Sequence, residues 1–301
     1  MKDNGVQEVG RCPICGAAGC EQHAVCVDYV ISHESYVLGR CPDCGMVFTC
    51  QPPDETEMTG YDKLGLKLQL GDNPTGLVHK LYWHARSIML RRKAGLIEMF
   101  SGRNSGNLLN YGAKTGFFSS FMEDRGWNVT SVEKYHEERF FSLENFHHRM
   151  ISVSDMQTLK PQAFDIVTMW HVFEHNREPE SLLERFHTLL RPAGLLVVAC
   201  PNFTSTDAVH YGPYWAGYDV PRHLWHFTPL TITRMAEKCG FTLMHHEPLP
   251  FDSFYISILS EQNMGHGLAF VRGMYHGLVS WLKSKQNRGR SSSLVYVFRK
   301  K

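Results

Sequence analysis

Four cysteines near the start of the chain lie in two short motifs of the same form. Cys12 and Cys15 belong to CPICG, and Cys41 and Cys44 belong to CPDCG. The glycine of each motif permits a turn that aims backbone N–H groups at the thiolates, and four thiolates complete a tetrahedral zinc site. Such a site has no open coordination position, so we expect a structural zinc ion. Its binding, worth about 10–16 kcal/mol, can hold together a ribbon too small for its own core.

The other cysteines near these motifs are expected to pack rather than to bind metal. Cys20, Cys26 and Cys50 lie around the motifs, as does His23. The chain has nine cysteines, and its first residues lack the apolar run of a secretion signal. Reduced thiols and metal ligands are therefore expected instead of disulfides. We expect a cytoplasmic protein with a zinc ribbon over residues 1–52.

A second group of residues that could do chemistry covers 107–133, NLLNYGAKTGFFSSFMEDRGWNVTSVE. The pattern predicts a strand, a turn from Gly112 to Gly116, a helix, a second strand and then Glu133. In an open parallel sheet, ligands bind outside the carboxyl ends of the strands, where glycines let the backbone approach and an acid can accept both ribose hydroxyls. A nucleotide-type ligand is favoured. The alternative is that the glycines serve only helix packing.

The elements that position this loop alternate between strand and helix. A helix is expected at 77–100, a buried strand at 164–170 and a helix at 179–190 that starts at a proline. Such alternation predicts a doubly wound α/β domain, with a parallel sheet covered on both faces. Further strands are expected at 24–30 and 35–40 in the ribbon, and at 149–153, 195–199 and 241–246 in the core.

Composition limits the classes of partner. A net charge of +1 over 301 residues gives no general basic surface, which argues against a protein that mainly grips nucleic acid. No apolar run is long enough to span a bilayer. The sequence does not indicate an oligomeric state.

The glycine loop and the blocks after it resemble a class I S-adenosylmethionine-dependent methyltransferase over residues 104–249. The resemblance extends to the zinc ribbon. It implies a Rossmann-like, mostly parallel seven-stranded sheet, with strand 292–298 antiparallel to strand 241–246. Segment 53–103 would then be a linker or lid followed by a helix. The residues that the resemblance implies for S-adenosylmethionine are Tyr111, Gly112, Ala113, Gly116, Glu133, Asp155, Met156, Trp170 and His171. For Asp155, capping of a turn is the alternative.

Two further blocks carry the resemblance. FDIVTMWHVFEHNREPESLLERFHTLLRPAGLLVVACPN, residues 164–202, resembles strands four and five of the family with the helix between them. Its Glu174-His175 pair either lines the pocket or braces the loop. YWAGYDVPRHLWHFTP, residues 214–229, resembles the loop after strand five in a subgroup that includes sugar C-methyltransferases.

The catalytic histidine of those sugar enzymes falls on His223. Arg222 stands where they have a glutamate, and His226 stands where they have a tyrosine. A histidine suits proton removal because its unperturbed pKa of about 6.5 lies close to working pH. We therefore expect His223 as the general base, with His226 and His175 as the next candidates.

The function implied is methyl transfer to a small-molecule acceptor, such as a sugar or a lipid-linked envelope glycan intermediate. One alternative is an RNA methyltransferase that grips RNA with its zinc ribbon. Another is a catalytically weak pseudo-enzyme, because Lys114 replaces the middle glycine of the family's loop and Asn110 replaces its aspartate. If φ is positive at Lys114, the side chain costs about 1–2 kcal/mol.

The C-terminal segment, residues 250–301, is expected to contain a helix at 267–285. Apolar residues recur on it at helical spacing. They are Val271, Met274, Tyr275, Leu278 and Leu282. We expect this stripe to pack in the core. The alternative is peripheral docking at a membrane surface that carries a lipid-linked acceptor.

Overall fold

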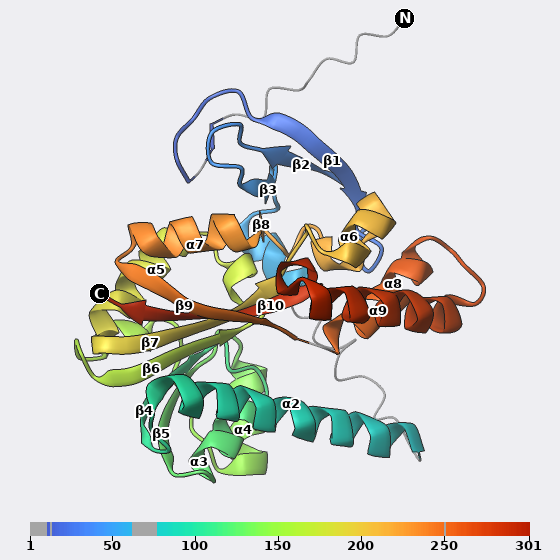
Figure 1. Cartoon of the computed structure of the whole chain (residues 1–301). Coiled ribbons are helices and arrows are strands. Elements are labelled where there is room, and N and C mark those ends of the chain that lie inside the picture. Colours follow the sequence, from blue (N-terminus) through green and yellow to red (C-terminus); the bar gives the residue numbers. More distant parts are fainter. Residues whose placement is uncertain (1–10, 13, 62–76, 250) are drawn as a thin grey trace, which may run out of the picture.

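The computed structural model describes residues 11–12, 14–61, 77–249 and 251–301. A six-stranded sheet lies at its centre, in the order β5-β4-β6-β7-β10-β9 (Figure 1). The strands β5, β4, β6 and β7 run parallel, and β10 is antiparallel to both β7 and β9. The strand bounds are Gly106–Tyr111 (β4), Trp127–Val132 (β5), Phe164–Trp170 (β6), Leu190–Pro201 (β7), Phe241–Pro248 (β9) and Ser293–Lys300 (β10). The predicted mostly parallel sheet and the antiparallel C-terminal strand are confirmed.

The described part of the chain has six strands in this sheet, not the expected seven. The strand expected at 149–153 is reduced to one parallel bridge between Val132 and Ile151. The chain turns immediately afterwards, because the backbone N–H and the hydroxyl of Ser152 both donate to the carboxylate of Asp155, at 3.2 and 2.7 Å. The short helix η1, Asp155–Thr158, begins there. This local turn leaves too little extended chain for a strand.

Helices cover both faces of the sheet, as the alternating pattern predicts. Successive strand residues point to opposite faces. Leu108 and Ile166 pack in one buried cluster with residues of α2 and α3, whereas Leu109 and Val167 pack in the other with residues of α5 and α7. The helix bounds are Leu77–Ser101 (α2), Phe117–Glu123 (α3), His136–Phe146 (α4), Pro179–Leu189 (α5), Thr206–Tyr211 (α6) and Pro229–Lys238 (α7). The expected linker or lid falls largely on residues 62–76, outside the described residues.

The N-terminal ribbon forms a second sheet with the order β1-β2-β3-β8. Its strands are Glu21–Val27 (β1), Ser35–Arg40 (β2), Val47–Thr49 (β3) and Trp225–His226 (β8). The first strand ends at residue 27 rather than 30, because the Asp28 carboxylate accepts backbone N–H groups of the following turn. The fourth strand, β8, comes from the loop after β7. The ribbon is therefore hydrogen-bonded to the α/β core.

The four motif cysteines come together at the end of the ribbon. Their sulfur atoms all lie within 4.8 Å of one another. The Sγ atoms of Cys12 and Cys44 are 3.7 Å apart, and those of Cys15 and Cys41 are 3.5 Å apart. Zinc–thiolate bonds of about 2.3 Å in a tetrahedron place sulfurs about 3.8 Å apart, so the cluster fits zinc.

Two helices, α8 (Asp252–Asn263) and α9 (Ala269–Gln286), form an antiparallel hairpin beside the core (Figure 1). Their contact uses small residues, because a side chain at Gly273 or Gly277 would meet the α8 backbone at 2.4 or 2.7 Å. The apolar stripe of α9 faces outward instead, with its five residues 40% to 63% exposed. The prediction that this stripe packs in the core is wrong. None of the helices in the described part of the chain combines the length and hydropathy of a bilayer span.

We expect the purified protein to contain one zinc ion held by the four motif cysteines. Cys44→Ser should lose the metal and lower the melting temperature, because the ribbon depends on that ion for its stability. Metal analysis of the wild type and the variant, together with thermal unfolding, tests this expectation. Cys50→Ser is the matched control and should keep both the zinc and the melting temperature. The assignment would be contradicted if the wild type contained no metal and had the same melting temperature as Cys44→Ser.

Candidate functional site

A cavity of about 1290 Å³ opens at the carboxyl ends of β4, β5 and β6. A single ligand pocket usually measures about 300–1,000 Å³, so this cavity has room for a cofactor and a second molecule. The ribbon forms part of its wall with residues 26–30, and one face of α8 forms another part. The cavity therefore lies where the core, the ribbon and the helical hairpin meet.

Seven of the predicted site residues line this cavity. They are Tyr111, Gly112, Glu133, Met156, His171, His175 and His223. Five others do not line it. They are Ala113, Gly116, Asp155, Trp170 and His226.

The glycine loop is held in left-handed backbone conformations. Gly112 has φ +68°, and an added Cβ would lie 2.4 Å from a methyl group of Val172. Lys114 has φ +49°, and a lysine is strained at such a positive φ. Its side chain lines the cavity. Gly116 has φ +86°, but it faces Ser142, so it serves the packing of the helix.

Glu133 follows β5 and is 4% exposed. One carboxylate oxygen accepts the backbone N–H of Lys114 at 2.7 Å, and the other accepts that of Tyr135 at 3.1 Å. These bonds fix the carboxylate at the cavity wall, and each oxygen keeps a lone pair for a further donor. This arrangement suits a pair of ribose hydroxyls.

Four further residues predicted to bind the cofactor differ in position: one lines the cavity and three do not. Met156 is buried and lines the cavity, as an apolar neighbour of an adenine ring would. Asp155 is exposed and accepts hydrogen bonds from Ser152. It therefore caps a turn, as the alternative interpretation of this residue predicts. Trp170 lies behind the wall, with the Lys93 ammonium 4.2 Å above its ring. Ala113 donates its N–H to the carbonyl of Val132.

Glu174 is the buried charge around which the histidines gather. It is 1% exposed, and neither carboxylate oxygen has a hydrogen bond within the usual limits. Burial would raise the pKa of this carboxyl, but the approach of His171 and the charge of His223 bring it down to about 2. Its carboxylate oxygen lies 3.5 Å from Nδ1 of His171 and 3.9 Å from Nε2 of His223. Glu174 is thus a carboxylate at the cavity wall.

One ring nitrogen of His223 is hydrogen-bonded to a backbone carbonyl, and the other ring nitrogen lies near two carboxylates. Nδ1 lies 2.9 Å from the carbonyl of Gly217, which accepts only if Nδ1 carries the proton. Nε2 is then the basic nitrogen, 3.5 Å from Asp219 and 3.9 Å from Glu174. Arg222 pairs with Asp219 and holds that carboxylate in place.

His175 and His226 occupy different positions from His223. His175 bonds through Nδ1 to the carbonyl of Arg222 at 3.0 Å, and the backbone carbonyl of Glu174 accepts the N–H of Leu224 at 2.8 Å. The pair therefore braces the loop as well as lining the cavity. Burial and the charge of His223 lower the pKa of His175 to about 4. Ligand atoms of Glu174, His175 and His223 lie within 4.8 Å of one another, so the cluster could also hold a divalent cation.

His226 points to the ribbon instead of the cavity. Its Nε2 lies 3.1 Å from Oγ1 of Thr49, and that hydroxyl donates to the carbonyl of His223 at 2.6 Å. Burial lowers the pKa of His226 well below its usual value, so the ring is neutral. His226 supports the loop that carries His223.

Three functional neighbours were missed by the sequence reasoning. Thr49 holds the His223 loop from the ribbon, Asp219 faces His223, and Asp252 pairs with His171 at 3.1 Å. Asp219 lies within the 214–229 block, so it could have been found there. Thr49 and Asp252 belong to no motif, because their roles arise from contacts between segments far apart in sequence.

Comparisons with known proteins place these observations in context. A family model described as a methyltransferase domain matches residues 82–246. The ubiquinone biosynthesis O-methyltransferase of Aeromonas salmonicida is 26% identical over 160 residues, which cover 47% of this chain and 67% of that protein. That of Chromobacterium violaceum is 31% identical over 102 residues, covering 32% and 44%. The chain spans about half to two thirds of the length of the curated relatives it matches.

Among solved structures, the 1,6-didemethyltoxoflavin-N1-methyltransferase of Burkholderia thailandensis is similar with a TM-score of 0.49 and 16% identity. The match covers 87% of this chain and 98% of that chain. That structure contains 1,6-didemethyltoxoflavin and S-adenosylhomocysteine.

The ion pair of His171 should make stability depend on pH. Burial would lower the pKa of His171, but its bonds to Asp252 and Glu174 raise it to about 9. The unfolded value is about 6.5, so the folded value is the higher one, and the stabilisation is complete below about pH 6.5 and lost as pH rises through about 9. Urea unfolding should show the wild type losing stability over this range relative to His171→Gln. Parallel pH curves for the two proteins would contradict the pairing.

Proposed function

The chain belongs to the methyltransferase-domain family as a class I S-adenosylmethionine-dependent methyltransferase, and on this basis we propose that it methylates a hydroxyl group of a small molecule, with His223 as the general base. The observation that carries the proposal is the position of His223 at the cavity wall, with Nδ1 fixed by Gly217 and Nε2 beside two carboxylates. This position combines a directed lone pair with groups that stabilise the ring once it is protonated.

The cofactor fits the other side of the cavity. S-adenosylmethionine, when bound, supplies an electrophilic methyl group. We assign its ribose to the Glu133 carboxylate, its adenine to the side of Met156, and its methionine part to the loop at Tyr111 and Gly112. Lys114 lines the same part of the cavity, where its ammonium can pair with the cofactor's carboxylate.

His223 would act on the acceptor as the methyl group is transferred. Nε2 takes the hydroxyl proton, and the proton on Nδ1 stays with the carbonyl of Gly217. The imidazolium that results is stabilised by Glu174 and Asp219, because opposite charges at 3.5–3.9 Å in a buried site attract strongly. Glu174 keeps its negative charge for this purpose, since its pKa is held at about 2.

A hydroxyl acceptor is supported by the curated relatives, which are named as O-methyltransferases. The loop around His223 resembles that of sugar C-methyltransferases, which supports the expectation of a sugar or a lipid-linked glycan intermediate but not the choice of oxygen as the reacting atom. A phenolic ring and a sugar both present a hydroxyl to Nε2, so we propose the hydroxyl as the reacting group in either case.

RNA is disfavoured as the acceptor by the charge of the ribbon. Residues 11–52 contain two arginines, Arg11 and Arg40, against four acids, which gives a net charge of −2. A ribbon that grips phosphates needs the opposite sign. Its bonds to the His223 loop give it a different role, as a wall and support of the cavity.

We expect calorimetric titration to show binding of S-adenosylmethionine by the wild type. Glu133→Gln should weaken it about 10- to 100-fold, because a hydrogen bond to a charged group contributes about 1.5–3 kcal/mol. Lys114→Gly removes both the strained side chain and its ammonium: weaker binding than the wild type would show that the ammonium pairs with the cofactor's carboxylate, and tighter binding would show that the strain outweighs that pairing. Absence of binding by the wild type at millimolar ligand would leave the pseudo-enzyme alternative.

We expect His223→Asn to lose methyl transfer while it keeps affinity for S-adenosylmethionine. General base catalysis contributes about 10²–10⁴-fold, which sets the expected loss in kcat. The assay follows label from the cofactor's methyl group onto a panel of phenolic and sugar compounds. His147→Asn, which changes an exposed histidine at the C-terminal end of α4, is the matched control and should retain activity. Equal rates for His223→Asn and the wild type would end the role of His223 as base.

A further inference from the structure

The outward face of α9 is a continuous apolar stripe. It consists of Val271, Met274, Tyr275, Leu278 and Leu282, which are 63%, 40%, 63%, 43% and 48% exposed. These positions repeat at intervals of three and four residues, so they lie on one side of the helix. Phe270 and Leu268, at 67% and 68% exposure, extend the apolar surface past the start of the helix. A contiguous apolar stripe on a protein surface is typical of a contact with another protein or with a membrane.

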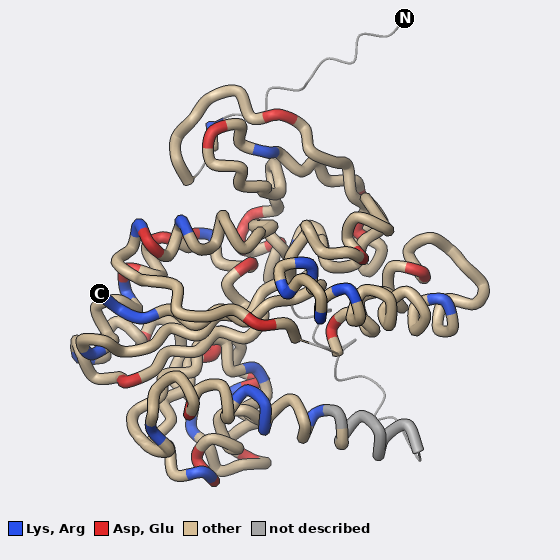
Figure 2. The backbone as a smooth tube through the Cα atoms, viewed as in Figure 1, with Lys and Arg blue, Asp and Glu red and all other residues tan. Residues whose placement is uncertain are grey.

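The charge of this part of the chain is strongly one-sided. Residues 267–291 contain five Lys and Arg residues and no Asp or Glu, whereas the whole chain has a net charge of only +1. They are Arg272, Lys283, Lys285, Arg288 and Arg290, of which Arg272 is paired with Glu261. Figure 2 shows basic residues toward both ends of α9 and in the turn that follows it. Basic residues therefore lie beside the apolar stripe, at both ends of α9.

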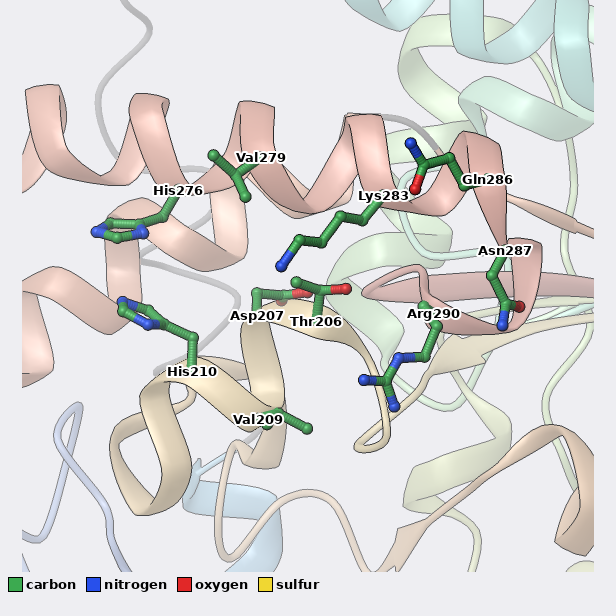
Figure 3. A pocket seen from close by; sticks show the side chains of 10 residues that line it. All are labelled: Thr206, Asp207, Val209, His210, His276, Val279, Lys283, Gln286, Asn287 and Arg290. Carbon is green, nitrogen blue, oxygen red and sulfur yellow. The ribbon is translucent and has the colours of Figure 1, made fainter.

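A pocket of about 460 Å³ lies along the edge of the stripe, between α9 and α6 (Figure 3). We call it the basic pocket. It is lined by Thr206, His210, His276, Lys283, Asn287 and Arg290 among others. In Figure 3 the ammonium of Lys283 and the guanidinium of Arg290 both reach into it. Within the described ranges neither side chain has an ion pair or a hydrogen bond.

The acid in the wall of this pocket is already engaged. Asp207 is 2% exposed, and its two oxygens accept hydrogen bonds from Trp215 Nε1 and Ser280 Oγ, each at 2.8 Å. Both oxygens of the Asp207 carboxylate therefore already have hydrogen-bond donors within the protein. The two cationic groups, the Thr206 hydroxyl and the Asn287 amide form a donor set that suits a phosphate group.

A metal ion is a poorer occupant of this region. His210, Glu261 and His276 present ligand atoms within 4.8 Å of one another. However, Arg272 donates to the Glu261 carboxylate at 2.7 Å, and His266 is paired with the same oxygen. A cation would have to compete with a guanidinium that the carboxylate already binds.

We propose that α9 docks on an anionic phospholipid surface, with the apolar stripe at the boundary of the acyl chains and a lipid phosphate in the basic pocket. The basic pocket lies at one side of the stripe, because His276, Val279 and Lys283 follow each other along the adjacent row of the helix. A helix that lies in the membrane plane presents both features at the same depth, apolar residues below and cations at the phosphates. The proposal does not depend on the methyl acceptor.

Docking in this orientation places α9 at the lipid surface and α8 behind it. The α8 helix packs on α9 through Phe254 and Ile258, and another side of α8 lines the cavity with Ile256 and Leu259. The hairpin of α8 and α9 therefore lies between the bound membrane and the site of methyl transfer.

The proposal is tested by sedimentation of the full-length, zinc-loaded protein with vesicles. We expect binding to phosphatidylcholine vesicles that contain phosphatidylglycerol and little binding to phosphatidylcholine alone. The double variant Lys283→Gln/Arg290→Gln should bind about 30-fold more weakly, since each basic residue near an anionic surface contributes a factor of about five. Tyr275→Ser/Leu278→Ser should bind at least about tenfold more weakly, because it removes apolar area from the interface.

Matched controls and competing outcomes keep the test specific. Lys160→Gln and Met99→Ser change exposed residues of the same types elsewhere and should bind like the wild type. Circular dichroism confirms that each variant is folded. Equal binding to both vesicle compositions, or equal binding of all variants, would overturn the proposal. So would saturable binding of inorganic phosphate in the basic pocket without vesicle binding, which would indicate a soluble ligand. Dimerisation lost in Tyr275→Ser/Leu278→Ser, again without vesicle binding, would assign the stripe to a second copy of the chain.

Discussion

The pairing of strand β3 with strand β8 is the contact on which the rest of the site depends. It joins residues Val47 and Phe48 of the ribbon to His226 and Trp225 of the loop after β7. Thr49 adds a hydroxyl bond to the carbonyl of His223 and a backbone bond to Leu224. The cysteine cluster lies directly before β3 in the chain, and β3 in turn pairs with the loop. The cysteine cluster and the candidate base are therefore linked through a few hydrogen bonds, although they lie in separate motifs.

The site contains several groups whose position is energetically unfavourable, and contacts with the surrounding structure must stabilise them. Glu174 is a carboxylate without a hydrogen bond in a buried position, where His171 supplies a positive charge nearby. His171 and Lys114 both have positive φ, at +55° and +49°, where a side chain is strained. Such features gather where a protein binds and reacts with ligands, because they place charged groups at a cavity wall before the ligand arrives.

The hairpin of α8 and α9 shows how one pattern of residues can have two meanings. Apolar spacing on α9 identifies a face, but it does not say what that face contacts. The opposite face carries Gly273, Gly277, Ser280 and Ser284, and small residues let two helices approach closely. Once that face is packed on α8, the apolar stripe must point away from the protein. The small residues on the glycine and serine face of α9 therefore decided which face of this helix packs on α8.

The sequence by itself determined the elements and most of the chemistry, because both depend on local patterns. The strand and helix order, the four-cysteine cluster, and the glycine loop with Glu133 could be predicted from residue type and spacing, and the resemblance to a family placed His223 in the loop after β7. Local patterns cannot reveal contacts between distant segments. Only the tertiary structure turned His226 toward Thr49 and away from the cavity, placed Asp252 against His171, and reduced the strand at 149–153 to one bridge. Each of these was decided by which segments pack together, and the free energy of that packing is a property of the whole fold.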